Sequence, residues 1–359
     1  MQRRQFLKRA VTGAAAGSAL GAGALAQPGE QVRWRMATPW PAGPLLIRAP
    51  QMMAERVSEL TNGNFEIRVY MGGEVVPALE TLDAVQQGIV ECGHGWGPYW
   101  IGKNRAFAID GGIPFGLNSR QHYAWFYNAG GMDLLHELYR DFGVIGWPAG
   151  NCDYQMGGFF REEIHGVDDI RGLRFRIGGL GGEILSRMDV STQVIAGGEI
   201  FSALERGAVD AAEWVGPFDD EQLGLHQVAR YYYYPSWWEP GTPLSLYVNL
   251  GAWENLPPEY QAALETAARE VNLRHMAMYD YENTEALKRL ADQGVQLREF
   301  PREIMLRAEE ISNDVYQEFS ERDATWAEIF GHWSNFRDEV RESFETMAFS
   351  YANFFYSER

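Results

Sequence analysis

The sequence predicts an α/β protein with two similar lobes. The chain opens with a strand, a helix and a second strand. A helix, glycine and strand pattern then occurs twice, in two separate regions of the chain. No low-complexity linker divides the 359 residues, which are 46% hydrophobic and include 12 Trp. This length and composition allow two ordinary domains with real cores, and crossing strands rather than a flexible tether would join them.

The opening elements follow from local patterns. VRWRMATPW, from Val32, alternates apolar and polar residues like a strand, and its end is rich in Pro and Gly. Residues 50–60 have helical spacing through Met53, Val57 and Leu60. TNG then ends the helix, and FEIRVYMGG returns as a strand. A β–α–β order favours a parallel sheet layer.

Two segments resemble each other, ETLDAVQQGIVECGHG and EIFSALERGAVDAAEW. In each, a short helix ends at a glycine, Gly88 or Gly207, and a short strand follows. Ligands of open α/β sheets bind beyond the carboxyl ends of strands. We therefore expect residues 94–99 to form one wall of a crevice and residues 213–214 to form the other.

The remaining regular elements alternate in type. YQMGGFF, at 154–160, is expected to be a strand, and GLRFRIGG another, with Arg174 and Arg176 on one face. LSLYVNL is a further expected strand, and a long helix should follow the turn at Pro257 and Pro258. From Pro301 onward the chain is expected to be mostly helical, acidic and aromatic.

Residues 1–26 have the pattern of a twin-arginine-type signal peptide. Arg3 and Arg4 precede a Gly/Ala-rich stretch that ends in the small-residue site Ala24-Leu25-Ala26. The stretch falls short of the roughly 20 apolar residues that a spanning helix needs. The alternative is a disordered or membrane-anchoring N-terminus. The pattern predicts export to the periplasm.

The charge and the cysteines restrict the possible partners. A formal net charge of -18 argues against nucleic acid and anionic membrane surfaces, since both attract basic patches. Cys92 and Cys152 are the two cysteines, and they do not form a C-x-x-C motif. They could pair in an oxidising compartment, but they do not make a disulfide framework or a structural zinc site.

No familiar catalytic motif is present. The chain lacks G-x-S-x-G, H-E-x-x-H, a P-loop and the dinucleotide-binding glycine pattern. GGLGGEI, at 178–184, could hold an anion at backbone N–H groups, but it has no P-loop lysine. The seven histidines are scattered, and we expect them to be solvated or satisfied in the core. They are His94, His122, His136, His165, His226, His275 and His332.

Two acids beside tryptophans, Glu213 and Glu239, indicate an oxygen-ligand site. Buried acids are rare unless they are paired or bound to a metal, and Na⁺, Ca²⁺ and Mg²⁺ prefer carboxylate, amide and carbonyl oxygens. A solvated surface position is the alternative for both. Asp219, Asp220 and Glu221 are instead expected to begin a helix, where acids suit the positive end of its dipole.

Arg176 is the candidate cation. It lies on an alternating apolar strand before two glycines, and its planar fork suits a carboxylate. An interior salt bridge or an exposed edge position is the alternative. Together with amides at Asn151 and Gln155, it would suit a small organic acid whose other oxygen is bound by a metal at the two glutamates.

Four stretches, GNCDYQMGGFFREEI, GLRFRIGG, AGGEIFSALERGAVDAAEWVGPFDDEQLG and YYYYPSWWEPG, resemble the substrate-binding proteins of TRAP (tripartite ATP-independent periplasmic) transporters. The similarity is strongest to the branch that binds 2-oxo acids or lactate with a metal ion. It implies a two-lobed periplasmic-binding-protein fold, with a ligand cleft between the lobes and a long helix spanning both. Lobe I would comprise 31–152 plus 242–281. Lobe II would comprise 153–241 plus 282–359, including the C-terminal helices.

The resemblance also implies roles for individual residues. Arg176 matches the arginine that pairs with the substrate carboxylate, and Asn151 matches an assisting amide. Gln155, Glu213 and Glu239 match the metal-binding side chains, and the metal would be sodium or calcium. Trp214 would add a backbone carbonyl to the metal and form a wall of the substrate pocket. Tyr99 aligns with a pocket tyrosine, although HGWGPYWIG departs from the tyrosine-rich run of the family.

The implied function is non-enzymatic. The protein would capture a 2-oxo or 2-hydroxy monocarboxylate, pyruvate-like or lactate, and deliver it to TRAP membrane subunits. The aromatic C-terminal helices resemble those of members that form homodimers by exchanging a helix. The alternatives are a periplasmic metal-dependent hydrolase or lyase, which needs a general base, and a chemosensory ligand-binding protein.

Overall fold

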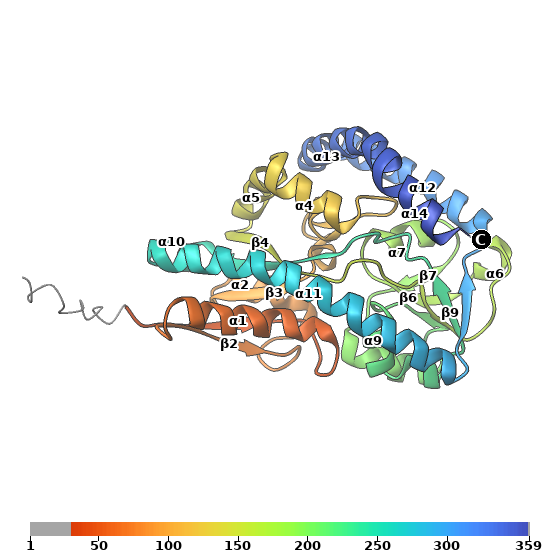
Figure 1. Cartoon of the computed structure of the whole chain (residues 1–359), viewed down its shortest axis with the longest axis horizontal. Helices are drawn as coiled ribbons and strands as arrows, with labels where there is room; N and C mark the ends of the chain where they lie inside the picture. Colours follow the sequence, from red (N-terminus) through yellow and green to blue (C-terminus); the bar gives the residue numbers. More distant parts are fainter. Residues whose placement is uncertain (1–29, 358–359) are drawn as a thin grey trace, which may run out of the picture.

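The computed structural model describes residues 30–357, so the predicted signal peptide at 1–26 lies outside the described residues. In this part of the chain the strands form two sheets (Figure 1). The five-stranded sheet has the order β2-β1-β3-β10-β4, and the six-stranded sheet has the order β11-β9-β5-β8-β6-β7. The first contains β1 (Val32–Ala37), β2 (Phe65–Tyr70), β3 (Cys92–Gly95), β4 (Val144–Asn151) and β10 (Pro243–Asn249). The second contains β5 (Gly158–Phe160), β6 (Arg174–Arg176), β7 (Ser191–Gln193), β8 (Ala211–Ala212), β9 (Tyr231–Tyr234) and β11 (Gln296–Glu299).

Helices cover both sheets (Figure 1). The α-helices are α1 (Arg48–Leu60), α2 (Thr81–Gln86), α3 (Phe107–Gly111), α4 (Ser119–Asn128), α5 (Gly131–Asp141), α6 (Val167–Ile170), α7 (Gly179–Ser186), α8 (Ile200–Glu205), α9 (Pro217–Gln222), α10 (Leu250–Glu254), α11 (Pro258–Asp292), α12 (Arg302–Arg322), α13 (Ala324–Phe344) and α14 (Ser350–Tyr356). Short 3-10 helices are η1 (Leu45–Ile47), η2 (Ala78–Glu80), η3 (Gly97–Trp100), η4 (Gly197–Glu199) and η5 (Leu225–Gln227), and η6 (Glu345–Phe349) is a π-helix.

The opening β–α–β unit is confirmed. β1 and β2 pair in parallel, from Val32 opposite Phe65 to Ala37 opposite Tyr70. α1 buries Met53 and Val57 completely, on the face that the helical spacing predicted. The sheet as a whole is mixed, because β10 runs antiparallel to both β3 and β4. A parallel layer therefore describes only β2, β1 and β3.

The repeated helix, glycine and strand pattern is also confirmed, and its two copies belong to different sheets. α2 is followed by Gly88 and β3, and α8 is followed by Gly207 and β8. The glycines have φ values of 68° and 67°, left-handed conformations that side chains disfavour. Both sheets thus send a short strand toward the space between them.

The helix α11 connects the two halves of the molecule (Figure 1). It has 35 residues, about 50 Å of helix. Its N-terminal part packs on α1 and β4, and α9 packs against it as well. Buried residues occur along its length, from Leu264 to Leu290. The long helix that spans both lobes is therefore confirmed.

The expected strand at 154–160 is wrong over its first half. Within this range only β5 is a strand. Asp153 has a positive φ of 54° and Gly158 one of 91°, so the chain turns just before and just after residues 154–157. Tyr154 is 63% exposed. The stretch forms one of the connections between the sheets. The connection from β9 to β10 runs beside it, and Cys152 N donates a hydrogen bond to Thr242 O at 3.0 Å.

The C-terminal segment is helical from α12 to α14, as expected. α12 and α13 pack together through buried rings that include Tyr316 and Trp326. Beyond α13 the apolar side chains are exposed; they are Met347, Phe349, Tyr351, Phe354, Phe355 and Tyr356. Among residues 30–357, no helix combines the length and the apolar character needed to cross a membrane.

Candidate binding site

The candidate site lies between the two sheets, where several strands end. Trp96 and Tyr99 follow β3, Arg176 is the last residue of β6, and Glu213 and Trp214 follow β8. The expected two-walled crevice is thus present. It encloses a cavity of about 20 Å³, enough for one or two water molecules, so the walls must separate to admit an organic acid. The lining residues are Trp40, Leu46, Trp96, Tyr99, Cys152, Gln155, Arg176, Glu213, Trp214, Val215, Glu239, Thr242 and Leu244.

Arg176 is held in one orientation at the centre of this cavity. Its side chain is buried, and Nη1 donates to the backbone oxygen of Glu213 at 2.5 Å and to Oε2 of Glu213 at 2.9 Å. Nε donates to Ile195 O at 3.1 Å. The guanidinium carbon lies 5.0 Å from the centre of the Trp214 ring, a cation–π contact. Nη2 makes none of these bonds.

Arg176 pairs directly with Glu213, and its charge also acts on Glu239. Glu213 is 3% exposed and Glu239 is 5% exposed, so neither is the solvated surface acid of the alternative interpretation. Burial raises the pKa of Glu213 to about 8, against the opposing charge of Arg176. Burial also raises the pKa of Glu239 well above its usual range, and the charge of Glu213 adds to this shift. Such a pair needs a proton or a further cation for neutrality.

Gln155 orients Glu239 and offers an oxygen of its own. Its Nε2 donates to Glu239 Oε2 at 3.1 Å and to Thr242 Oγ1 at 2.8 Å. Thr242 Oγ1 also donates to Glu239 Oε2, at 3.3 Å. The amide oxygen Oε1 of Gln155 is buried without a hydrogen-bond partner. A buried carbonyl-type oxygen without a donor suits a hard cation.

The aromatic walls keep water out. Trp40 lies 6.5 Å from Trp214 and 6.2 Å from Tyr99, measured between ring centres. Trp96 lies edge-on to Tyr99 at 5.0 Å. Burial raises the pKa of Tyr99 to about 12, so its hydroxyl stays protonated and can donate a hydrogen bond. These rings lower the local dielectric and strengthen ion contacts inside the cavity.

Asn151 is the predicted site residue that does not line the cavity. It is buried at the end of β4, where Oδ1 accepts from Ser119 Oγ at 2.9 Å and from Asp153 N at 2.5 Å. Its Nδ2 has no partner. The next residue, Cys152, does line the cavity. The assisting role of Asn151 stays a prediction.

The acids of the DDE stretch begin α9, as expected, but two of them are buried. Asp219 accepts from Leu45 N and from Tyr279 OH, each at 2.6 Å. Asp220 accepts from Val215 N at 3.1 Å and from Tyr232 OH at 2.6 Å. Burial raises the pKa of each to about 7. These acids therefore secure buried backbone and tyrosine donors rather than a solvated helix end.

The other candidates occupy structural positions. His94 is in the core, where Nδ1 accepts from Trp40 Nε1 at 2.9 Å. Cys92 and Cys152 are buried and free, so they do not pair. Within residues 30–357, no cluster of three or more His, Cys, Asp or Glu side chains could hold a metal. A cation at the candidate site would need mixed carboxylate, amide and backbone oxygens.

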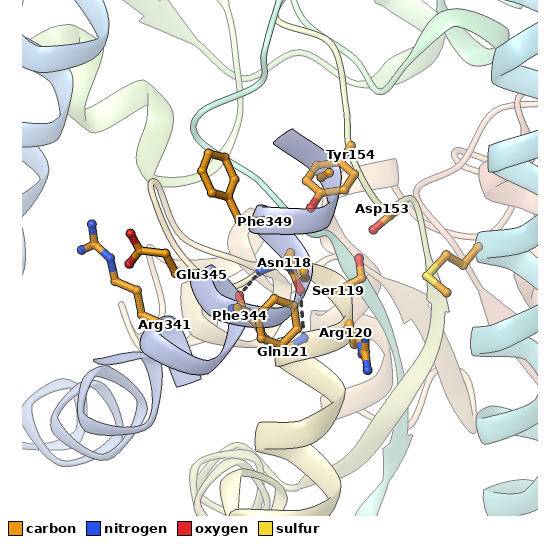
Figure 2. Close-up of a pocket in the computed structure, with 13 residues that line it drawn as sticks. Asn118, Ser119, Arg120, Gln121, Asp153, Tyr154, Arg341, Phe344, Glu345 and Phe349 are labelled. Atoms are coloured by element: carbon orange, nitrogen blue, oxygen red, sulfur yellow. Dashed lines mark hydrogen bonds between the residues drawn. The ribbon is translucent and has the colours of Figure 1, made fainter. Parts of the chain in front are cut away.

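A larger hollow lies elsewhere, beside the C-terminal helix (Figure 2). It measures about 680 Å³, and the rings of Tyr154, Phe344 and Phe349 lie around it. Asn118 and Gln121 form the capping box of α4, drawn as dashed lines in Figure 2. The two arginines that line this hollow, Arg120 and Arg341, are exposed. It is an open groove without the buried charges that converge at Arg176.

Sequence reasoning missed part of the cavity wall. Trp96 lies within the expected wall at 94–99, but Trp40 and Leu46 carry no signal that separates a wall residue from a core residue. Thr242 stands three residues after Glu239, inside the aromatic stretch YYYYPSWWEPGT, and that proximity could have indicated it. The charged and amide members were found because buried polar groups need a reason to be there.

Comparison with known proteins gives consistent matches. Residues 36–323 match the bacterial extracellular solute-binding protein family 7. The chain is 48% identical over 323 residues to a monocarboxylate 2-oxoacid-binding periplasmic protein of Nostoc sp. PCC 7120, covering 90% of this chain and 89% of the relative.

Two solved structures are similar along nearly their whole length. A TRAP transporter solute-binding protein of Bordetella bronchiseptica, a mixed-occupancy dimer with copurified calcium and picolinate, has 42% identity and a TM-score of 0.90, covering 91% of this chain and 98% of that one. A TRAP periplasmic solute-binding protein of Pseudoalteromonas atlantica, with bound sodium and pyruvate, has 34% identity and a TM-score of 0.87, covering 92% and 100%.

Proposed function

Because the chain belongs to family 7 of the bacterial extracellular solute-binding proteins, we propose that it captures a small 2-oxo monocarboxylate together with a metal ion. The resemblance to TRAP solute-binding proteins is confirmed by this membership, and so is the expectation that the chain is not an enzyme. The observation that best supports this proposal is an excess of buried acid over buried base. The charged side chains that line the cavity are two acids, Glu213 and Glu239, and one base, Arg176.

Arg176 would bind the ligand carboxylate. Its Nε and Nη1 are engaged by the protein, so the guanidinium is oriented before the ligand arrives. Nη2 is the donor that we assign to the ligand, with the Tyr99 hydroxyl as a second donor from the opposite wall. A charge-assisted bond in a dry cavity is strong and directional, which suits recognition of a carboxylate.

The residues present fit a hard cation. Glu213, Glu239 and Oε1 of Gln155 would hold it, with the Trp214 carbonyl as a backbone ligand. When bound, the ion would neutralise the two carboxylates and would supply a positive charge for a second oxygen of the ligand. Sodium and calcium both suit such oxygen donors, and relatives contain one or the other. A ligand with a 2-oxo oxygen beside its carboxylate can use Arg176 and the cation together.

Ligand size is limited by the walls. Trp40, Trp96 and Trp214 are buried, and the cavity must expand even for three-carbon acids. Among charged side chains of the cavity, Arg176 is the one cation, which disfavours dicarboxylates. Pyruvate-like acids and the 2-hydroxy acid lactate are the ligands that we propose.

The site lies between lobes whose limits we propose from the sheets. Lobe I would be 31–152 plus 242–281, and lobe II 153–241 plus 282–359. The five-stranded sheet falls in the first set and the six-stranded sheet in the second, which supports these limits. The lobes would close over the ligand by bending at the crossing segments near Cys152 and Thr242.

Export and delivery complete the proposal. The twin-arginine pattern of residues 1–26 would direct the folded protein to the periplasm, where TRAP membrane subunits would receive the ligand. We also propose a homodimer through the C-terminal helices. Its support is the row of exposed apolar side chains from Met347 to Tyr356, together with the dimeric state of the Bordetella relative.

Two alternative functions, an enzyme and a chemosensory protein, are affected differently by these observations. A hydrolase or lyase is not favoured, since the family consists of binding proteins and no histidine lines the cavity. A chemosensory role would use the same binding event, and identification of the membrane partner separates it from transport.

Native mass spectrometry with metal analysis of the exported protein tests the proposal. We expect the added mass of one small monocarboxylate, one sodium or calcium ion, and a dimeric assembly. A protein that carries neither ion nor acid, and that takes up neither from millimolar calcium or sodium with pyruvate or lactate, would contradict the binding proposal.

A further inference from the structure

The glycine-rich stretch after Arg176 contacts an indole. Gly178 and Gly179 lie against the six-membered ring of Trp96. A Cβ atom on Gly178 would lie 2.8 Å from Trp96 Cζ3, and one on Gly179 would lie 2.8 Å from Cη2. Real Cβ contacts essentially never approach so closely. We call these two glycines the Trp96 seat.

The indole is fixed from its other side. Trp96 Nε1 donates to the backbone oxygen of Gly111 at 3.0 Å. A Cβ on Gly111 would lie 2.4 Å from that nitrogen. Trp96 is 6% exposed and therefore has little room to turn away from the seat. Glycines are thus required on both sides of one ring.

The seat joins parts of the chain that belong to different sheets. Trp96 follows β3 of the five-stranded sheet, and the seat follows β6 of the six-stranded sheet. Pro98 adds to the same contact, since a Cβ on Gly179 would lie 3.2 Å from its Cβ. Trp96 also lines the ligand cavity, and Gly178 stands two residues after Arg176, another residue of the cavity lining.

We propose that the Trp96 seat is a closing contact between the lobes, and that Gly178 is glycine so that the indole can cover the ligand site. The inference rests on the proposed binding function. When the lobes part, Trp96 leaves with the five-stranded sheet and the seat leaves with the six-stranded sheet. A side chain at 178 would then have space in the open form and none in the closed form.

The two glycines differ as targets for a test. Gly178 has φ −98° and ψ 177°, an extended conformation that alanine adopts without strain. Gly179 has φ +61°, so alanine there would strain the lobe by itself. Gly178→Ala is therefore the informative variant. Gly182→Ala, in the helix α7 that Gly178 precedes, is its matched control, because the nearest atom to its new Cβ is 3.5 Å away.

Calorimetric titration with pyruvate in the presence of calcium measures the effect on binding. We expect Gly178→Ala to weaken binding at least about tenfold, the size of a typical overpacking cost, while Gly182→Ala binds like the parent protein. Small-angle X-ray scattering, with and without pyruvate and calcium, should show that Gly178→Ala stays more extended than the parent. Circular dichroism melting of both variants establishes that they fold.

Trp96→Phe makes the test specific to the seat, because phenylalanine lacks the ring atoms that Gly178 touches. Trp96→Phe should weaken binding by itself, and Gly178→Ala added to it should weaken binding less than twofold further. Equal effects of Gly178→Ala in both backgrounds would overturn the inference. So would scattering curves for Gly178→Ala that match the parent in both states, whether or not the parent binds pyruvate. A parent protein that binds none of the tested acids would contradict the proposed function instead.

Discussion

Gln155 Nε2 donates a hydrogen bond to Glu239 Oε2 at 3.1 Å, and this bond joins the two segments that cross between the sheets. The bond uses the nitrogen of the amide and leaves its oxygen buried without a partner. Glu239 therefore has a fixed orientation, and the amide that orients it carries a buried oxygen without a donor. This arrangement supports our proposal that the acid within the aromatic stretch is one member of a cation site.

The first prediction concerns Arg176. Replacing it with alanine should weaken pyruvate binding about 100-fold or more, because a buried carboxylate would lose its charged partner. Arg174→Ala is the matched control: it lies on the same strand, is exposed, and pairs with Asp210 at the surface. Calorimetric titration of both variants in excess calcium checks the prediction. Unchanged affinity in a folded Arg176→Ala protein would contradict the role that we assign to it.

The second prediction concerns the cation. Glu239→Gln preserves shape and removes one charged ligand, so calcium affinity should fall at least about 100-fold, the upper range seen when supporting contacts of a metal are lost. Pyruvate affinity should become insensitive to calcium. Glu221→Gln is the control, since Glu221 pairs with Arg289 outside the cavity. Calcium titration monitored by calorimetry separates the two, and equal calcium affinities would exclude Glu239 as a ligand.

Local patterns were sufficient for much of the fold. The alternation in β1 and the glycines Gly88 and Gly207 act through neighbouring residues, so their consequences could be predicted from the sequence. The conformation of 153–157 depends instead on its path between two sheets, and the expected strand there was wrong. For the site, charged residues were identifiable because burial of charge is rare. Trp96 lay within the expected wall at 94–99, but its contact with glycines of distant segments could not be predicted, because that contact is a tertiary property.

The third prediction concerns protons. In the metal-free protein, burial raises the pKa of Glu213 to about 8 and that of Glu239 well above its usual range, so the buried pair retains a proton at pH 7. A metal needs the carboxylate form, so calcium binding at pH 7 should release protons, and its affinity should increase as the pH rises toward 8. Titrations in Tris and in MOPS, which differ in ionisation enthalpy, count the released protons. Identical heats in the two buffers would be contrary to this expectation.

The raised pKa of Glu213 also determines the direction in which the stability of the metal-free protein changes with pH. Between pH 4.5 and about 8 the folded metal-free chain binds more protons at Glu213 than the unfolded chain does. The free energy of unfolding of the metal-free protein should therefore decrease as the pH rises through this range. Saturating calcium should oppose the decrease, because it binds the deprotonated folded form.

The fourth prediction concerns Asp219, which contacts both η1 and α11 outside the cavity. Burial raises its pKa from 3.8 to about 7, so the folded chain holds a proton there that the unfolded chain has lost. Stability should fall as the pH rises from about 4 to 7. Asp219→Asn cannot titrate, keeps an acceptor for Leu45 N, and can donate to the Tyr279 hydroxyl. Its free energy of unfolding should vary less across this range than that of the parent, by about 1–3 kcal/mol.

Urea unfolding at pH 5 and pH 8, with the metal removed, measures this difference for Asp219. Removing the metal from both proteins matters because Glu213 titrates in the same range, and its contribution then cancels in the comparison. Asp338→Asn, at an exposed carboxyl on α13, controls for the change in net charge. We expect Asp338→Asn to follow the parent curve and Asp219→Asn to be flatter. If the free energy of unfolding of Asp219→Asn varies with pH as strongly as that of the parent, the Asp219 carboxyl is not the group that takes up the proton. Asp220, which is equally buried beside Tyr232, then becomes the next candidate.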